Sequence, residues 1–171
     1  MRSTDSKVIR AQGNWRIHPI DAPSFLFGPF LKVVEQWRSK CRAGRFPNWS
    51  DYDITDFAGW YGWISLNRID PTARDVFVEL FGTRMAEALG MELTGRNMRD
   101  PTLGVSPDHA ERVFSHFNAV ISTPGIGLRS ISLAPMAREH VSGWILDLPV
   151  AKSDGPISHV MTFAARTSTG K

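Results

Sequence analysis

Hydrophobic side chains recur at helical spacing in two parts of the chain. Over residues 24–43, five of them fall on one helical face: Phe30, Val33, Val34, Trp37 and Cys41. A second helix is expected to start at Ser106-Pro107-Asp108, because a serine cap, a proline at the first helical position and an acid in the first turn are typical of a helix start. Pro124-Gly125 is expected to end this helix. Its apolar face consists of Ala110, Val113, Phe114, Phe117, Val120 and Ile121.

Shorter segments have the composition and alternation of β-strands: 61–69, 76–81, 127–134, 140–150 and 157–166. In the fourth, Trp144, Leu146 and Leu148 fall on one face, which is continuously apolar. Consecutive strands are joined by short connections, which force antiparallel neighbours. The order of elements predicts an α+β fold, with a five-stranded antiparallel sheet, helices over one face and an additional N-terminal helix.

The same pattern divides the chain into three parts. Residues 1–23 are polar and interrupted by prolines, which predicts an irregular extension. Residues 24–59 are expected to form the N-terminal helix and a connector, and residues 60–168 the main domain. An isolated helix of this length is not stable, so its apolar stripe must pack on the domain or on a partner subunit.

Composition excludes several classes of protein. Of the 171 residues, 42% are hydrophobic, which is enough to build a core. The formal charge is only +3, and basic residues are not interleaved with aromatic ones, so we expect no nucleic-acid partner. Apolar runs are too short for a membrane span, and the N-terminus does not resemble a secretory signal. The single Cys41 excludes an internal disulfide, and the simplest expectation is a cytoplasmic protein.

One region has a distinctive arrangement of glycines. The strand 76–81 ends at Phe81-Gly82-Thr83-Arg84, a short helical turn follows, and Gly90 leads to Leu93-Thr94-Gly95-Arg96. Gly82 is expected to permit a sharp exit from the strand, because glycine tolerates positive φ. The next residue but one, Arg84, is a candidate for binding a carboxylate or phosphate, or for pairing with an acid.

These residues, together with Trp37-Arg38, Gly44-Arg45-Phe46-Pro47 and Asp51-Tyr52-Asp53-Ile54, resemble a PAS-like family common in alphaproteobacteria. The resemblance implies a PAS fold and a role as a sensory or protein-interaction module. It also implies an interior between the sheet and the helices that can hold a ligand. The candidates to line that interior are Trp63, Phe81, Arg84, Met85, Met98, Phe114, Phe117, Asn118 and Trp144.

Catalytic and cofactor motifs are missing from the sequence. No phosphate-binding loop, nucleophile elbow or metalloprotease motif is present, and the acids are dispersed, so we expect a protein that is not an enzyme. His109 and His116 lie on the same side of the second helix, and PAS domains that bind haem make them weak candidates for haem ligands; boundary residues, half exposed, are the simpler interpretation. Flavin photochemistry of the cysteine-adduct type is disfavoured because Cys41 lies on the N-terminal helix.

The leading hypothesis is therefore a module that binds a small ligand or a signalling protein and acts by association. A homodimer through the N-terminal helix is expected to use the stripe Phe30, Val33, Val34 and Trp37. Three alternatives stay open: an adaptor without a ligand, a haem-binding sensor, and a small enzyme on the same scaffold.

Overall fold

The structure, a computed structural model, describes residues 15–132, 142–153 and 155–167. Its longer helices are α1 (Leu31–Lys40), α2 (Thr83–Leu89) and α3 (Pro107–Ser122). The strands are β1 (Trp15–Pro19), β2 (Ile64–Asp70), β3 (Asp75–Phe81), β4 (Arg96–Asn97), β5 (Gly125–Ser132), β6 (Ser142–Val150) and β7 (His159–Arg166). Short 3-10 turns complete the chain at Ser24–Phe30, Trp49–Asp51, Ile54–Phe57 and Pro101–Leu103.

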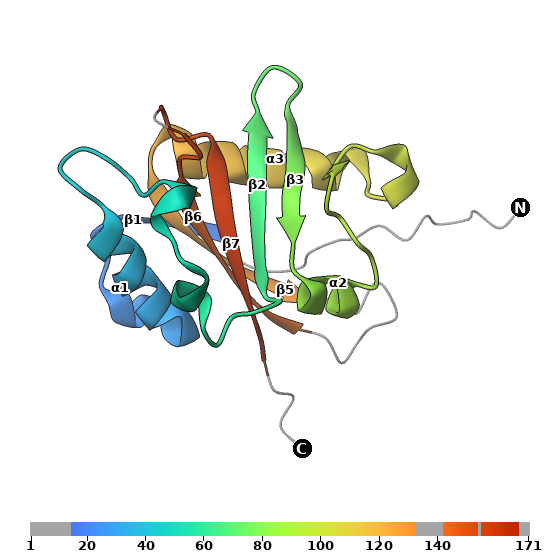
Figure 1. The fold of residues 1–171 in the computed structure, drawn as a ribbon. Helices are drawn as coiled ribbons and strands as arrows, with labels where there is room; N and C mark the ends of the chain where they lie inside the picture. The colour runs from blue at the N-terminus through green and yellow to red at the C-terminus, as the bar shows by residue number, and fades with distance from the viewer. Residues whose placement is uncertain (1–14, 133–141, 154, 168–171) are drawn as a thin grey trace, which may run out of the picture.

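The seven strands of the described residues form one antiparallel sheet in the order β1-β5-β6-β7-β2-β3-β4 (Figure 1). The α+β prediction is confirmed, but the predicted number of five strands is wrong. The two additional strands, β1 and β4, lie at the edges of the sheet, where each needs only one partner. Both are short and lack the apolar alternation that marked the central strands, which is why the sequence pattern missed them. The prediction of an irregular segment 1–23 is therefore wrong for Trp15–Pro19, which forms β1.

The N-terminal helix is shorter than its hydrophobic pattern indicated. Gly28, with φ of 50°, kinks the chain inside the turn Ser24–Phe30, and regular α-helix begins only at Leu31. Ser24 does not cap a helix; its hydroxyl accepts a hydrogen bond from Arg38 Nη1 at 2.8 Å. By contrast, the second helix begins as predicted, because Ser106 Oγ accepts from the backbone N–H of His109 at 3.1 Å.

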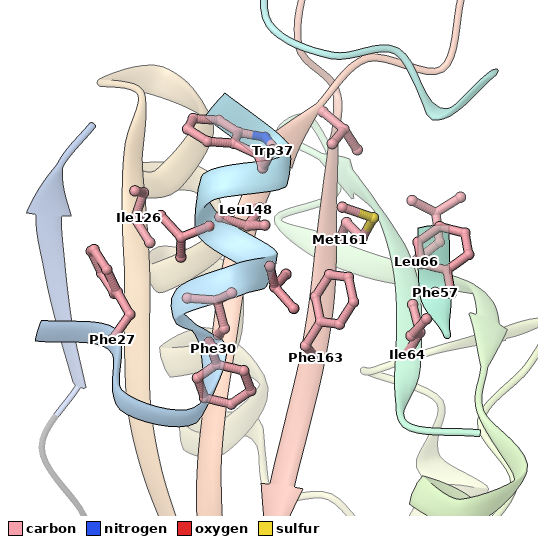
Figure 2. Close-up of a cluster of buried hydrophobic side chains, with 14 of the residues drawn as sticks. Phe27, Phe30, Trp37, Phe57, Ile64, Leu66, Ile126, Leu148, Met161 and Phe163 are labelled. Carbon is pink, nitrogen blue, oxygen red and sulfur yellow. The ribbon is translucent and has the colours of Figure 1, made fainter. Parts of the chain in front are cut away.

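Helices cover both faces of the sheet. Figure 1 shows α3 behind β2 and β3, where it packs on a core that includes Val76, Val78 and Val160. On the opposite face α1 packs against Leu148, Met161 and Phe163 (Figure 2). The N-terminal segment therefore packs on the same sheet as the rest of the chain, and α1 and α3 form layers on its two faces.

This packing corrects the predicted dimer surface. The stripe Phe30, Val33, Val34 and Trp37 is buried against the chain's own sheet, with at most 5% of any of the four side chains exposed. The predicted fold placed helices over only one face of the sheet, so its other face had no packing partner. The stripe of the N-terminal helix covers that face. A homodimer stays a prediction, but these four residues are not its contact surface.

Gly82 has a different role from the one predicted. Its φ is −60°, which any residue can adopt. A Cβ at this position would lie 2.2 Å from the carbonyl oxygen of Gly62, so glycine is required for the close approach of two backbones.

Among the described residues, every helix is too short or too polar to cross a lipid bilayer.

Candidate functional site

A cavity of about 170 Å³ lies between the sheet and helices α2 and α3. Five of the predicted lining residues are present in its wall: Trp63, Phe81, Met85, Met98 and Phe117. Most of the other lining side chains are also apolar, among them Val76, Val113 and Ile145. The cavity is therefore an apolar space with a small number of polar groups, which is the usual character of a small-molecule site.

Four predicted residues lie elsewhere. Phe114 is buried in the core beside the cavity, and Asn118 is half-buried on α3 without lining it. Arg84 is exposed at the start of α2, where its side chain packs against Gly62. Trp144 lies on the opposite face of the sheet, 38% exposed, because its strand neighbour Ile145 faces the cavity and successive side chains alternate.

A row of polar side chains that was not predicted from the sequence crosses the cavity floor. Ser65 on β2, Thr162 on β7 and Asp147 on β6 are direct cross-strand neighbours. Asn67, two residues after Ser65, points to the same face and joins the row. Ser65, Asn67 and Thr162 line the cavity and are only 3%, 5% and 3% exposed. Each residue alone reads as an ordinary polar position of a strand; only the register of three strands brings them together.

Asp147 is the centre of a buried charged cluster at one end of this row. Arg129 donates from Nε to Oδ2 at 2.6 Å and from Nη2 to Oδ1 at 2.9 Å. Thr162 Oγ1 lies 2.8 Å from Oδ1, and His116 Nε2 lies 3.0 Å from Oδ2. Burial by itself raises the pKa of Asp147, but the Arg129 charge and the bond to His116 outweigh it and hold that pKa well below its usual range. Asp147 is therefore ionised, and all four contacts must donate to it.

Gly127 makes room for this cluster. It lies opposite Asp147 in the β5–β6 pairing, and a Cβ on it would lie 2.8 Å from His116 Nε2. A side chain here would push His116 off the carboxylate. The Gly125-Ile126-Gly127 segment thus has a packing role beneath α3.

Aromatic rings enclose the Arg129 end of the cavity. The Arg129 guanidinium lies 4.9 Å from the Trp15 ring centroid and 5.1 Å from that of Phe117. Trp15 also contacts the His109 and His116 rings edge to face, at centroid distances of 6.1 and 5.3 Å. Trp15 comes from the edge strand that was not predicted, so its place in the site could not be anticipated.

The two histidines of α3 have different environments. His109 lines the cavity and is half-buried, as expected of a boundary residue. His116 is 8% exposed and bonded to Asp147, so the interpretation of it as a half-exposed residue is wrong. The register of α3 over the sheet turns His116 toward β6, and a buried carboxylate there compensates for its burial.

The side chains considered as cofactor ligands from the sequence are engaged elsewhere in the structure. His116 Nε2 is engaged by Asp147. Cys41 packs with the core on the other face of the sheet. Among the described residues, no group of three or more His, Cys, Asp or Glu side chains is arranged to hold a metal ion.

A second polar cluster lies outside the cavity. Ser158 Oγ is 2.7 Å from His159 Nδ1, and His159 Nε2 is 3.1 Å from Glu79 Oε1. The three residue types match a hydrolytic triad, but none of them lines the cavity, and Glu79 also pairs with Lys152. The cluster links β3 to β7 outside the cavity.

Comparison with known proteins leaves the family open. No protein-family model matches this sequence, and no curated protein matches it. A solved structure described as an RNA-binding light-oxygen-voltage receptor aligns with 91% of this chain at 15% identity and a TM-score of 0.42. The chain spans 39% of the length of that receptor. A similarity of this size assigns neither a family nor an activity, so the PAS-like resemblance remains an interpretation of the sequence.

The environment of His109 predicts a dependence of stability on pH. Burial, followed by repulsion from Arg129 and Arg112, lowers the pKa of His109 to about 4. An unfolded histidine has a pKa of about 6.5, so between pH 6.5 and 4 the unfolded chain binds a proton that the folded chain does not. We expect the free energy of unfolding to fall by about 2 kcal/mol from pH 7 to pH 4.5.

Urea denaturation at several pH values measures this loss in the wild type and in His109→Gln. Part of the fall in the free energy of unfolding with decreasing pH should persist in the variant, because burial also lowers the pKa of His159. An identical slope in both proteins would show that His109 does not contribute.

Proposed function

We propose that this protein is a sensory module of PAS type that binds a small ligand between the sheet and helices α2 and α3. The observation that supports the proposal is the apolar cavity with a buried polar row on its floor. Such a combination provides hydrophobic contact for most of a ligand and a few fixed polar groups that orient it. A cavity of about 170 Å³ corresponds to a ligand of one or two rings.

The sheet offers a route from the ligand to the rest of the molecule. Along β7, Thr162 faces the cavity while Met161 and Phe163 pack against the α1 side. A ligand that shifts β7 therefore acts on both helical layers, because close-packed side chains transmit small displacements. We propose that the response is read by association with a second copy of the chain or with a signalling protein.

The rival proposal is an adaptor with a filled interior and no ligand. An unfilled apolar cavity lowers the free energy of unfolding by about 24 cal/mol per Å³. In an adaptor without a ligand, no binding energy would offset this loss. The presence of the cavity favours the ligand-binding module over the adaptor. A binding module is proposed in preference to an enzyme because Arg129, which lines the cavity, is committed to Asp147.

A substitution that fills the cavity tests the proposal. Ala164 is buried on β7 and lines the cavity, so Ala164→Phe places a ring inside it. Isothermal titration calorimetry measures the binding of benzene to both proteins. We expect benzene to bind the wild type, and to bind this variant at least about tenfold more weakly. Native mass spectrometry of the wild type as purified should in addition reveal any small molecule retained from the cell.

The matched control is Ala73→Phe, in the exposed turn between β2 and β3. It should bind benzene as the wild type does. If benzene binds neither the wild type nor the control, the adaptor is the better description.

A further inference from the structure

The hydrogen-bond directions in the polar row are fixed by chemistry. Asn67 Nδ2 lies 3.2 Å from the carbonyl oxygen of Val160, which can only accept, so the amide nitrogen is placed there and Oδ1 faces Ser65. Ser65 Oγ lies 2.9 Å from that Oδ1 and must donate to it. The second N–H of Asn67 points to Thr162 Oγ1 at 3.3 Å.

Thr162 completes the chain of donors. Its Oγ1 lies 2.8 Å from Oδ1 of the ionised Asp147, which can only accept, so the threonine hydrogen goes to the carboxylate. Every hydrogen of the row is therefore used within the protein: Ser65 donates to Asn67, Asn67 to Val160 and Thr162, and Thr162 to Asp147. What the row retains toward the cavity is lone pairs, on Ser65 Oγ, Asn67 Oδ1 and Thr162 Oγ1.

We infer that the ligand is a neutral aromatic compound of one or two rings that carries an N–H or O–H donor directed at Ser65, Asn67 and Thr162. The inference rests on the proposed function and specifies the ligand class for the same cavity. The row presents only acceptors, so a donor on the ligand gains a hydrogen bond at this floor that a ligand acceptor cannot make there. The unpartnered buried N–H of Trp15 belongs to another part of the lining.

The charges around the cavity favour a neutral ligand. Asp147 is fully buried and is matched by the guanidinium of Arg129, which binds both of its oxygens. The other lining arginine, Arg166, is exposed to solvent, so a charged ligand inside the cavity would lose its hydration beside a pair that is already compensated. A neutral N–H or O–H group meets the acceptors without that penalty.

The apolar walls favour an aromatic ring. Trp63, Phe81 and Phe117 contribute rings to the lining. Aromatic pairs gain about 0.5–1.5 kcal/mol beyond the area they bury when they stack or meet edge to face. Met85 and Met98 add sulfur atoms, which also make favourable contacts with aromatic rings.

The test compares three two-ring compounds of similar shape by isothermal titration calorimetry on the whole protein. Indole donates through its N–H, indene has a carbon in the same ring position, and quinoline has a nitrogen that only accepts. We expect indole to bind about tenfold more tightly than indene, and quinoline more weakly than indole. Equal binding of indole and indene, tighter binding of quinoline, or no binding of indole overturns the inference.

Benzene, measured in parallel, separates the two levels of the argument. If indole fails to bind preferentially while benzene still binds, the ligand class is wrong and the proposed cavity function stands. If benzene fails as well, the proposed function is wrong and the inference falls with it.

Variants locate the donor contact. Ser65→Ala combined with Thr162→Val leaves only the Asn67 oxygen in the row, so the preference for indole over indene should fall by about threefold or more. The control, Thr72→Val in the exposed turn after β2, should keep the wild-type preference. Circular dichroism and benzene binding check that the double variant is folded, and an unchanged preference in it overturns the assignment of the row.

Discussion

Replacing Asp147 by asparagine is expected to lower the free energy of unfolding by about 3–5 kcal/mol. The wild-type carboxylate is fully buried and accepts hydrogen bonds from Arg129, His116 and Thr162. In Asp147→Asn the guanidinium of Arg129 stays buried without a counter-charge, and the new amide NH2 faces other donors. Loss of one partner of a buried ion pair is among the most destabilising single changes.

Urea denaturation followed by tryptophan fluorescence measures this loss. Asp21→Asn, at an exposed position, is the matched control and should change the free energy of unfolding by less than about 0.5 kcal/mol. Replacing the pair together, Asp147→Leu with Arg129→Met, removes both charges, and this variant should be more stable than Asp147→Asn alone. A loss below about 1 kcal/mol in Asp147→Asn would contradict the role given to the cluster.

The difference in stability between the wild type and Asp147→Asn should also depend on pH in the acid range. The pKa of Asp147 is lower in the folded chain than the value of about 3.9 in an unfolded chain. Its contribution to stability is therefore fully present above that value and is lost as the pH falls through the folded pKa. The difference in stability between the wild type and Asp147→Asn should narrow below about pH 4.

Truncation of Trp37 to alanine is the second change with a large expected effect, again about 3–5 kcal/mol. Trp37 is 1% exposed, stacks on Phe46 at 5.7 Å between ring centroids, and donates from Nε1 to the carbonyl oxygen of Pro149 at 3.1 Å. Alanine leaves a large void between α1 and the sheet and removes the donor from a buried carbonyl. The loss concerns the folding of one chain, because the side chain packs on its own sheet.

Thermal and urea denaturation of Trp37→Ala measure the effect, and Trp144→Ala provides the same substitution on the same face. Trp144 is 38% exposed, so its removal should cost about 1 kcal/mol or less. Light scattering of Trp37→Ala distinguishes the present assignment from a dimer contact. A variant that stays as stable as the wild type and only dissociates would show that the stripe joins two chains after all.

The elements that depend on neighbouring residues were predictable. α3 begins at Ser106 and Pro107 as expected, because capping is a contact between residues three positions apart. The turn at Asp70-Pro71 and the end of α2 at Gly90 are likewise local. The edge strands were missed, since β1 is defined by its pairing with β5 more than a hundred residues later.

The candidate site was predictable only in part. Met85 and Phe117 line the cavity as expected, because each follows from an apolar position on a helix that must face the sheet. Trp144 was assigned to the wrong side: alternation shows that it shares a face with Leu148, but it does not show which helix covers that face. The N-terminal stripe was read as a dimer surface for the same reason, since a hydrophobic face does not name its partner.

The sequence by itself determined the types and order of most elements, their antiparallel connection and the apolar residues available for a core. These depend on local propensity, capping and the periods of helix and strand, all of which are written within a few residues. Tertiary structure alone decided which face of the sheet each helix covers and which polar residues meet. Ser65, Thr162 and Asp147 lie far apart in the chain and form one hydrogen-bonded row only through the register of β2, β7 and β6. Register is a property of paired strands, so the cavity floor exists only after folding.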